Sequence, residues 1–211
     1  MKNAKLALVL ILGCGMLFSC SKSDPAPVLK ATTFSNLAAD PPSGGYNPAN
    51  GQPIGVTKKY TFFSFATGAI VANADSATSK WDLGFNGTTI ILNSGTSGPG
   101  TAAAQVVLGI FGESNLAPDN GYRQDNKLVT ADPYAIKKGS GNGWYNYDGA
   151  SNVITPIAGR VIMVQCANGK YAKMEILSYY KDAPAAPTNT SIDRYYSFHY
   201  LYQPDGSKKL Q

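Results

Sequence analysis

Charged residues, histidine and cysteine are scarce in this sequence of 211 residues. Charged side chains make up 15% of it, well below the roughly 25% of an average soluble domain. With one histidine, His199, and three cysteines, the chain lacks the several His and Cys ligands that a zinc site needs, so we expect no metal site. No apolar run beyond the N-terminus is long enough to cross a bilayer, which excludes a polytopic membrane protein.

The residues of the common catalytic centres are also missing. A Ser-His-Asp hydrolase needs a histidine placed as a base, but His199 lies in a strand pattern and no Gly-x-Ser-x-Gly motif occurs. Cys166 lies at the end of a predicted strand without a neighbouring base to activate it. We therefore expect no catalytic residues and no enzymatic activity. One alternative stays open, a glycan hydrolase with two carboxylates, because a sequence does not show which acids meet in space.

The N-terminus carries the most specific signal in the chain. A positive start at Met1–Lys5 is followed by 13 apolar residues, Leu6–Phe18. As a helix they would span about 20 Å, less than the hydrocarbon core of a bilayer at roughly 30 Å, so a secretion signal fits better than a spanning helix. The stretch ends in Leu-Phe-Ser-Cys at Cys20, which resembles the lipobox of bacterial lipoproteins. We expect a signal peptide at residues 1–19 and a lipid anchor on Cys20.

Processing at Cys20 fixes the domain organisation that we expect. Removal of residues 1–19 leaves 192 residues and lowers the net charge from +5 to +3, because Lys2 and Lys5 are lost. The remaining basic residues are scattered, so nucleic acid is not expected as a partner. Residues 20–53 combine the lipidated cysteine with a flexible tether rich in Pro and Gly, in which 28–37 could form a first strand. Residues 54–211 then form a single β domain.

Short runs of aromatic and β-branched residues between turn signals predict an all-β fold of antiparallel strands, hairpins and long loops. Few or no helices are expected, at most short turns near residues 132–137. The alternation in the last strand puts Tyr196, Phe198, Tyr200 and Tyr202 on one face. The predicted strands lie at 60–65, 69–71, 81–92 with a turn at Asn86-Gly87, 105–111, 160–166, 171–179 and 195–202.

Four blocks of the sequence resemble the HmuY-like haem-binding lipoproteins of Gram-negative bacteria, in the same order. Three motifs carry most of the specificity: the pair Trp81-Asp82, the run Asn93–Gly98, and the hairpin Asn-Gly-Lys-Tyr-Ala-Lys that begins at Asn168. The resemblance implies a single all-β domain on the cell surface and haem held between two histidines. The blocks are YTFFSFATGAIV (60–71), WDLGFNGTTIILNSGTSGPG (81–100), residues 144–176 and YYSFHYLYQ (195–203).

The chain departs from this family at the residues that would bind iron. The family's haem binder has one axial histidine in the long loops before the conserved tryptophan and a second a few residues after it. No histidine occurs in residues 113–143 or directly after Trp144, so neither role can be assigned here. Methionine also ligates haem iron, but Met163 and Met174 lie in predicted hairpin strands, where core packing is the stronger interpretation. The axial ligand stays unknown.

These observations favour a non-enzymatic binding protein that is lipid-anchored in the outer membrane and exposed at the surface. Haem or another planar apolar ligand is the first ligand expected, bound through the aromatic residues Tyr134, Trp144, Tyr145 and Tyr147. The alternative interpretation of these four residues is that they cover one end of the sheet. The second functional hypothesis is an adhesin or accessory protein that binds protein or glycan through the same loops. An outer-membrane receptor is a further candidate partner.

Overall fold

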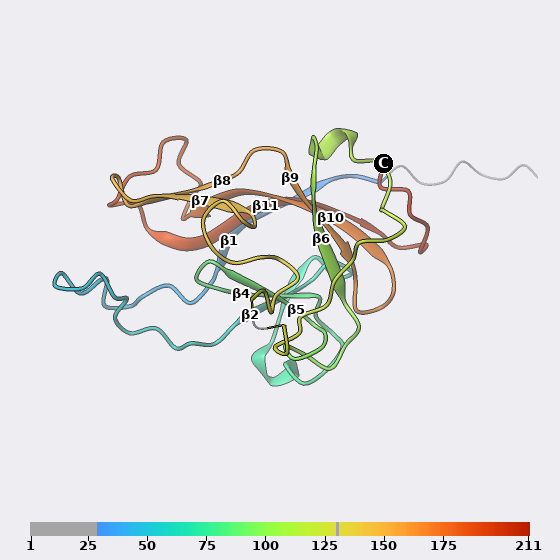
Figure 1. The fold of residues 1–211 in the computed structure, drawn as a ribbon, viewed down its shortest axis with the longest axis horizontal. Coiled ribbons are helices and arrows are strands. Elements are labelled where there is room, and N and C mark those ends of the chain that lie inside the picture. The colour runs from blue at the N-terminus through green and yellow to red at the C-terminus, as the bar shows by residue number, and fades with distance from the viewer. Residues whose placement is uncertain (1–28, 130) are drawn as a thin grey trace, which may run out of the picture.

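The computed structural model describes residues 29–129 and 131–211, and that part of the chain is almost entirely β structure (Figure 1). Helical geometry is limited there to two 3₁₀ turns, η1 (Asn73–Asp75) and η2 (Phe111–Glu113). No helix within these residues is long and apolar enough to span a membrane. The strands are β1 (Thr32–Ala38), β2 (Thr61–Ser64), β3 (Ala69–Val71), β4 (Leu83–Asn86), β5 (Thr89–Leu92), β6 (Ala103–Leu108), β7 (Tyr145–Asp148), β8 (Val153–Pro156), β9 (Arg160–Gln165), β10 (Tyr171–Tyr180) and β11 (Asp193–Gln203).

Two antiparallel sheets build the domain. The larger has the order β1-β11-β10-β9-β6, and its two longest strands, β10 and β11, pair over most of their length. The smaller has the order β3-β2-β4-β5, and Gly87 at the β4–β5 turn adopts φ 51°, a left-handed conformation that glycine takes without steric cost. A separate hairpin, β7–β8, lies beyond one end of the larger sheet. The all-β antiparallel fold predicted from the sequence is thus confirmed.

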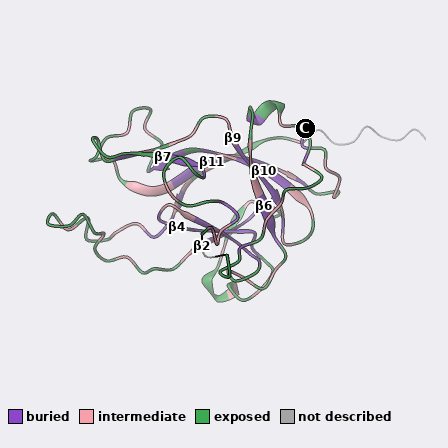
Figure 2. Ribbon diagram, viewed as in Figure 1, coloured by how far each residue is buried: buried purple, intermediate pink, exposed green. Residues whose placement is uncertain are grey.

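The main core fills the space between the two sheets, where Figure 2 shows the buried residues concentrated. The predicted alternation in β11 is confirmed for Tyr196, Phe198 and Tyr200, which all lie in this core, while Leu201 faces the opposite side. On that opposite side a second cluster packs around Val161, Met163, Phe111 and Leu210, under the loop that contains η2 and the C-terminal residues. The larger sheet is therefore covered on both faces over part of its area.

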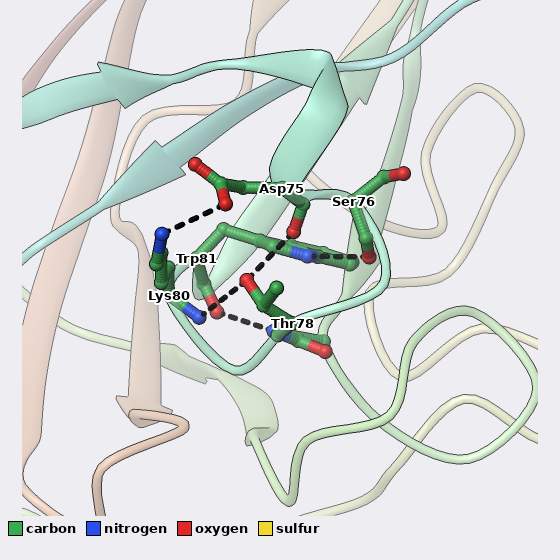
Figure 3. Close-up of polar contacts among 6 residues, drawn as sticks. Asp75, Ser76, Thr78, Lys80 and Trp81 are labelled. Carbon is green, nitrogen blue, oxygen red and sulfur yellow. Dashed lines mark hydrogen bonds and ion pairs between the residues drawn. The ribbon is translucent and has the colours of Figure 1, made fainter.

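Trp81 is fully buried in a third cluster with Phe62 and Ile91. Its indole N–H donates to the Ser76 carbonyl over 3.0 Å, and Figure 3 shows the ring lying under the loop that follows η1. An ion pair between Lys80 and Asp75 closes the outer side of the same loop. Trp81 is thus a core residue whose polar atom is satisfied.

Three local expectations need correction. The expected tether at 20–53 contains β1, whose pairing with β11 makes Thr32–Ala38 part of the sheet, so the folded region begins before residue 54. No helical turn forms at 132–137. The aromatic segment after Trp144 is a strand rather than a loop, because Tyr145–Asp148 pairs with β8. The signal peptide at 1–19 and the anchor at Cys20 lie outside the described residues.

Candidate ligand-binding site

The four aromatic residues predicted to bind ligand lie in three different environments. Tyr147, on β7, is 47% exposed. Trp144 and Tyr145 are buried in the main core. Tyr134 packs against the Trp81 cluster on the smaller sheet, with the Lys138 ammonium 5.4 Å from its ring centre. The structure therefore does not bring the four side chains together; of the four, Tyr147 lines the hollow described next.

That hollow, here called the tyrosine groove, has a volume of about 590 Å³. It is formed by three segments that are far apart in the sequence, which are residues 46–53, the β7–β8 hairpin, and the loop and strand ends between β10 and β11, together with Thr88 of the β4–β5 turn. A bridge between Tyr46 and Pro53 shapes the first segment. The lining residues are Tyr46, Asn47, Pro48, Gly51, Pro53, Thr88, Tyr147, Asn152, Ile154, Tyr179, Tyr180, Thr188, Asn189, Ser191, Asp193 and Arg194.

The tyrosines of the groove are held by specific contacts. The Tyr46 hydroxyl donates to the Asp193 carboxylate over 2.5 Å, which ties the first segment to the start of β11. The Tyr147 hydroxyl donates to Asn152 Oδ1 over 2.7 Å, across the β7–β8 hairpin. The Tyr180 hydroxyl accepts the Ile154 N–H over 2.8 Å. These bonds fix the rings before any ligand arrives, which lowers the entropy cost of binding.

Three phenol groups of the groove, those of Tyr46, Tyr179 and Tyr180, have a raised pKa and stay protonated at neutral pH. Burial raises the pKa of Tyr46, and its hydrogen bond to Asp193 raises it further. Burial likewise raises the pKa of Tyr179 and of Tyr180. Tyr46 therefore presents a neutral ring to the groove, and Tyr179 and Tyr180, 2% and 4% exposed, form an uncharged floor under it.

Arg194 is the cationic residue of the groove lining. Its Nη1 donates to the Asp40 carbonyl over 3.0 Å, whereas its Nε is buried without a hydrogen-bond partner. Its backbone adopts φ 60°, a left-handed conformation that is costly for a residue with a long side chain. A strained backbone and an unused donor at the edge of a hollow are features that often accompany ligand recognition.

Trp144 packs against Tyr179, one of the residues that line the groove. Its indole N–H donates to the Thr88 carbonyl over 3.1 Å, and its ring lies 5.7 Å from Tyr179 and 5.1 Å from Tyr196. Since Trp144 directly precedes β7, its burial also sets where the β7–β8 hairpin leaves the core and presents Tyr147. Trp144 and Tyr145 thus act on the groove through packing rather than by lining it.

In the part of the chain that the structure describes, the His, Met and Cys side chains do not line the groove. Met163 and Met174 are 2% and 0% exposed, one on each face of the larger sheet. His199 pairs with Glu175 and faces Phe111, 6.0 Å between ring centres. Burial raises the pKa of the Cys166 thiol well above its ordinary value. Among residues 29–129 and 131–211 no three His, Cys, Asp or Glu side chains gather as a metal site.

A second hollow of about 480 Å³ lies around Arg123 and Asp125 and has no aromatic lining. The Asp125 carboxylate accepts the backbone N–H groups of Leu92 and Ala135, both over 2.9 Å, so this buried acid is used to hold the loop. Burial raises its pKa, partly offset by these bonds. The tyrosine groove is therefore the better candidate for a ligand site.

Sequence reasoning missed Tyr46, Tyr179, Tyr180 and Arg194. The signal for the Tyr179-Tyr180 pair is two adjacent aromatics at a strand end, which breaks the alternation of inward and outward residues; the structure places a register shift there. Tyr46 is a lone aromatic in a segment of linker composition. Arg194 carries no local signal, because its partner Asp40 is 154 residues away.

Comparison with known proteins agrees with this fold. The model of the HmuY protein family matches residues 56–200, which is more than half of the chain, so the chain belongs to that family. No curated protein matches it.

The chain is also similar to solved structures at low sequence identity. One is described as a putative HmuY-like haem-binding protein from Bacteroides vulgatus, with 16% identity, a TM-score of 0.44, and coverage of 69% of this chain and 85% of that one. Another is an apo HmuY analogue from Tannerella forsythia, with 17% identity, a TM-score of 0.43, and coverage of 84% and 96%. A third is apo PinO from Porphyromonas gingivitis, with 15% identity, a TM-score of 0.46, and coverage of 84% and 98%.

Proposed function

We propose that this member of the HmuY family is a non-enzymatic binding protein that holds a planar aromatic ligand, a porphyrin first of all, in the tyrosine groove. The observation that carries the proposal is the convergence of Tyr46, Tyr147 and the Tyr179-Tyr180 pair, from three distant segments, on one hollow. Its volume of about 590 Å³ lies within the range of roughly 300–1,000 Å³ typical of small-molecule sites. Aromatic rings gain affinity for flat ligands by stacking and burial.

The lining suits the porphyrin ring better than it suits the iron of haem. The rings of Tyr46 and Tyr147, 44% and 47% exposed, can pack on a macrocycle, and Arg194 can pair with carboxylates at its edge. Histidine, methionine and cysteine do not line the groove, and the phenols of Tyr46, Tyr179 and Tyr180 are held protonated. A bis-histidine complex therefore does not fit these residues, and affinity would come from the organic ring.

The protein is further proposed to be a lipoprotein of the outer membrane, anchored through Cys20 and exposed at the cell surface. The support is the lipobox-like Leu-Phe-Ser-Cys sequence together with the preceding positive and apolar segments. Capture of a ligand at the surface would then be followed by transfer to an outer-membrane receptor.

A glycan is the second candidate ligand, and the polar half of the groove favours it. Asn47, Asn152 and Asn189 place amide groups beside the tyrosine rings, and Asp193 adds a carboxylate. A sugar ring presents an apolar face for stacking and hydroxyl groups for such partners. With a glycan as its ligand, the protein would act as an adhesin or accessory subunit rather than as a porphyrin carrier.

Titration of the purified protein with haemin, followed at the Soret band, tests the proposal, with iron-free protoporphyrin as competitor. Both should bind with similar affinity. Tyr147→Ala should weaken binding about five- to tenfold, the worth of a stacking contact of about 1–1.4 kcal/mol, and Tyr147→Phe should not, because it keeps the ring.

His199→Ala is the matched control and should leave binding unchanged, because that side chain lies on the other side of the larger sheet from the main core. A sharp low-spin spectrum that disappears in His199→Ala would contradict the assignment. Absence of porphyrin binding, together with a glycan that binds in a Tyr147-dependent way, would favour the second candidate.

A further inference from the structure

Three large aliphatic side chains stand exposed near η2. Leu108, at the end of β6, is 79% exposed, Ile110 is 63% exposed, and Leu116 is 64% exposed. Together these are called the 108–116 surface. Burying such side chains in an apolar environment is favourable by about 1.5–3 kcal/mol each, so three of them within nine residues of a surface loop need an explanation.

The backbone of this loop is held so that these side chains cannot turn inward. The Ile110 carbonyl accepts the N–H groups of Glu113 and Ser114, both over 3.0 Å. Leu116 forms a bridge with Lys209, and the neighbouring residues Phe111 and Ala117 take the buried positions under the loop. The exposure of Ile110 and Leu116 is therefore fixed by backbone pairing.

The described chain begins beside this surface. Leu29 packs against the cluster that contains Phe111, Ala117 and Leu210, next to Ile110 and Leu116. Nine residue steps separate Leu29 from Cys20, and they can span at most about 32 Å when fully extended. A bilayer that holds an acylated Cys20 would thus lie within this distance of the domain, on the side where Leu29 emerges.

The charges around the surface suit an anionic head-group layer. Lys30 and Lys209 are exposed, and Lys208 is paired with Asp119 over 2.7 Å. Glu113 and Asp205 are further exposed acids, and Arg160 lies opposite Leu108 on β9, so four basic and three acidic side chains leave an excess of one positive charge. Exposed aliphatic residues flanked by lysines are typical of segments that lie at a membrane interface.

The tyrosine groove lies at the opposite end of the same strands. Asp193 opens β11 in the groove, and Gln203 ends β11 by donating from its side-chain amide to the Lys209 carbonyl over 2.6 Å. Ten strand steps between them amount to about 33 Å. Figure 1 shows the β7–β8 hairpin at one end of the molecule and the C-terminus with η2 at the other.

We propose that the 108–116 surface rests on the lipid bilayer and orients the domain, so that the tyrosine groove opens away from the membrane. The inference rests on the proposed anchor at Cys20. The anchor alone would leave the domain free to tumble about its tether, whereas insertion of Ile110 and Leu116 fixes one orientation. Phe111, in the middle of this surface loop, faces His199, six strand steps or about 20 Å along β11 from Asp193 in the groove, so the ligand site lies away from the point of contact.

Tryptophan quenching in the full-length, lipidated protein tests the proposal, after reconstitution into vesicles of phosphatidylglycerol and phosphatidylcholine with brominated acyl chains. The native Trp81 and Trp144 are 0% and 2% exposed, so bromolipid should quench their fluorescence little, and their signal forms a constant background. Leu116→Trp reports from the 108–116 surface. Ile192→Trp is the matched control, because Ile192 is 59% exposed just before β11 at the groove end.

We expect bromolipid to quench the Leu116→Trp signal roughly twofold or more relative to Ile192→Trp. Adding Ile110→Asp to Leu116→Trp should reduce this quenching while thermal unfolding stays unchanged, since Ile110 is exposed.

Three other outcomes would overturn the inference. Protein that floats with the vesicles but shows equal quenching at both positions would overturn the orientation and leave the anchor intact. Protein that does not float would overturn the anchor and the orientation with it. Concentration-dependent burial of the indole introduced by Leu116→Trp, in the absence of vesicles, would point to a second copy on this surface and overturn the lipid assignment.

Discussion

Gly98 gives the sharpest test of how the Trp81 region is packed. A Cβ atom at this position would lie 2.4 Å from Asn93 Oδ1 and 2.6 Å from Trp81 Cζ2. Carbon atoms in contact prefer about 3.5–4.0 Å, so one neighbour must move by about 1 Å. Neither can move easily: Trp81 packs on Phe62 at 4.3 Å between ring centres, and the Asn93 amide donates to the Thr78 and Trp81 carbonyls over 2.9 and 2.8 Å.

Gly98→Ala should therefore cost about 3 kcal/mol, the upper part of the range for overpacking a core. The midpoint of thermal unfolding should fall by about 6–12 °C for a domain of this size. Gly112→Ala is the matched control, because a Cβ there meets nothing within 4 Å, and it should change stability by less than about 0.5 kcal/mol. Urea unfolding followed by circular dichroism measures both. Equal midpoints for the two variants would refute the packing described for Trp81.

Single contacts give three further predictions. Arg194→Gln should weaken binding of protoporphyrin about tenfold but leave binding of its dimethyl ester unchanged, because the guanidinium recognises carboxylates; competition titrations measure both. Burial raises the pKa of Asp40, but hydrogen bonds from Thr57 and Lys58 outweigh it and lower the pKa below 3.8. The stability that Asp40 supplies is present above pH 3.8 and lost as the pH falls, so acid unfolding of Asp40→Asn should show a weaker pH dependence. Cys20→Ala should abolish lipidation, which mass spectrometry of the N-terminal peptide and membrane fractionation detect.

The parts of the fold that the sequence predicts are those governed by local pattern. Alternation in β11 identifies Tyr196, Phe198 and Tyr200 as core residues, and the Asn86-Gly87 turn identifies the β4–β5 hairpin. β7 is missed because three of its four residues are exposed and its composition is that of a loop. Its strand geometry comes from pairing with β8 and from the burial of Trp144, which no local pattern encodes.

The candidate site could be predicted only in part, because it is assembled from non-local contacts. Tyr147 is found from its place after Trp144, but its neighbours in the groove come from residues 46–53 and from the end of β10. Trp144 itself was expected to touch ligand, whereas its bond to Thr88 and its packing on Tyr196 bury it. An aromatic residue in a predicted loop is equally consistent with a ligand contact and with a residue that packs on the core. The two roles can be told apart only from the residues that the side chain contacts in the structure.

The residues that carry the resemblance to the family have structural roles here. The Asp82 carboxylate accepts the N–H groups of Phe65 and Ala167, both over 2.8 Å, and so joins the smaller sheet to the β9–β10 hairpin. Asn93 and Gly98 enclose Trp81. None of these side chains lines the tyrosine groove. These contacts hold the fold together without the groove segments, so the fold alone does not determine what the groove binds. It follows that the ligand of this protein must be established from the groove itself, and that the tyrosine variants, rather than the family name, decide between a porphyrin and a glycan.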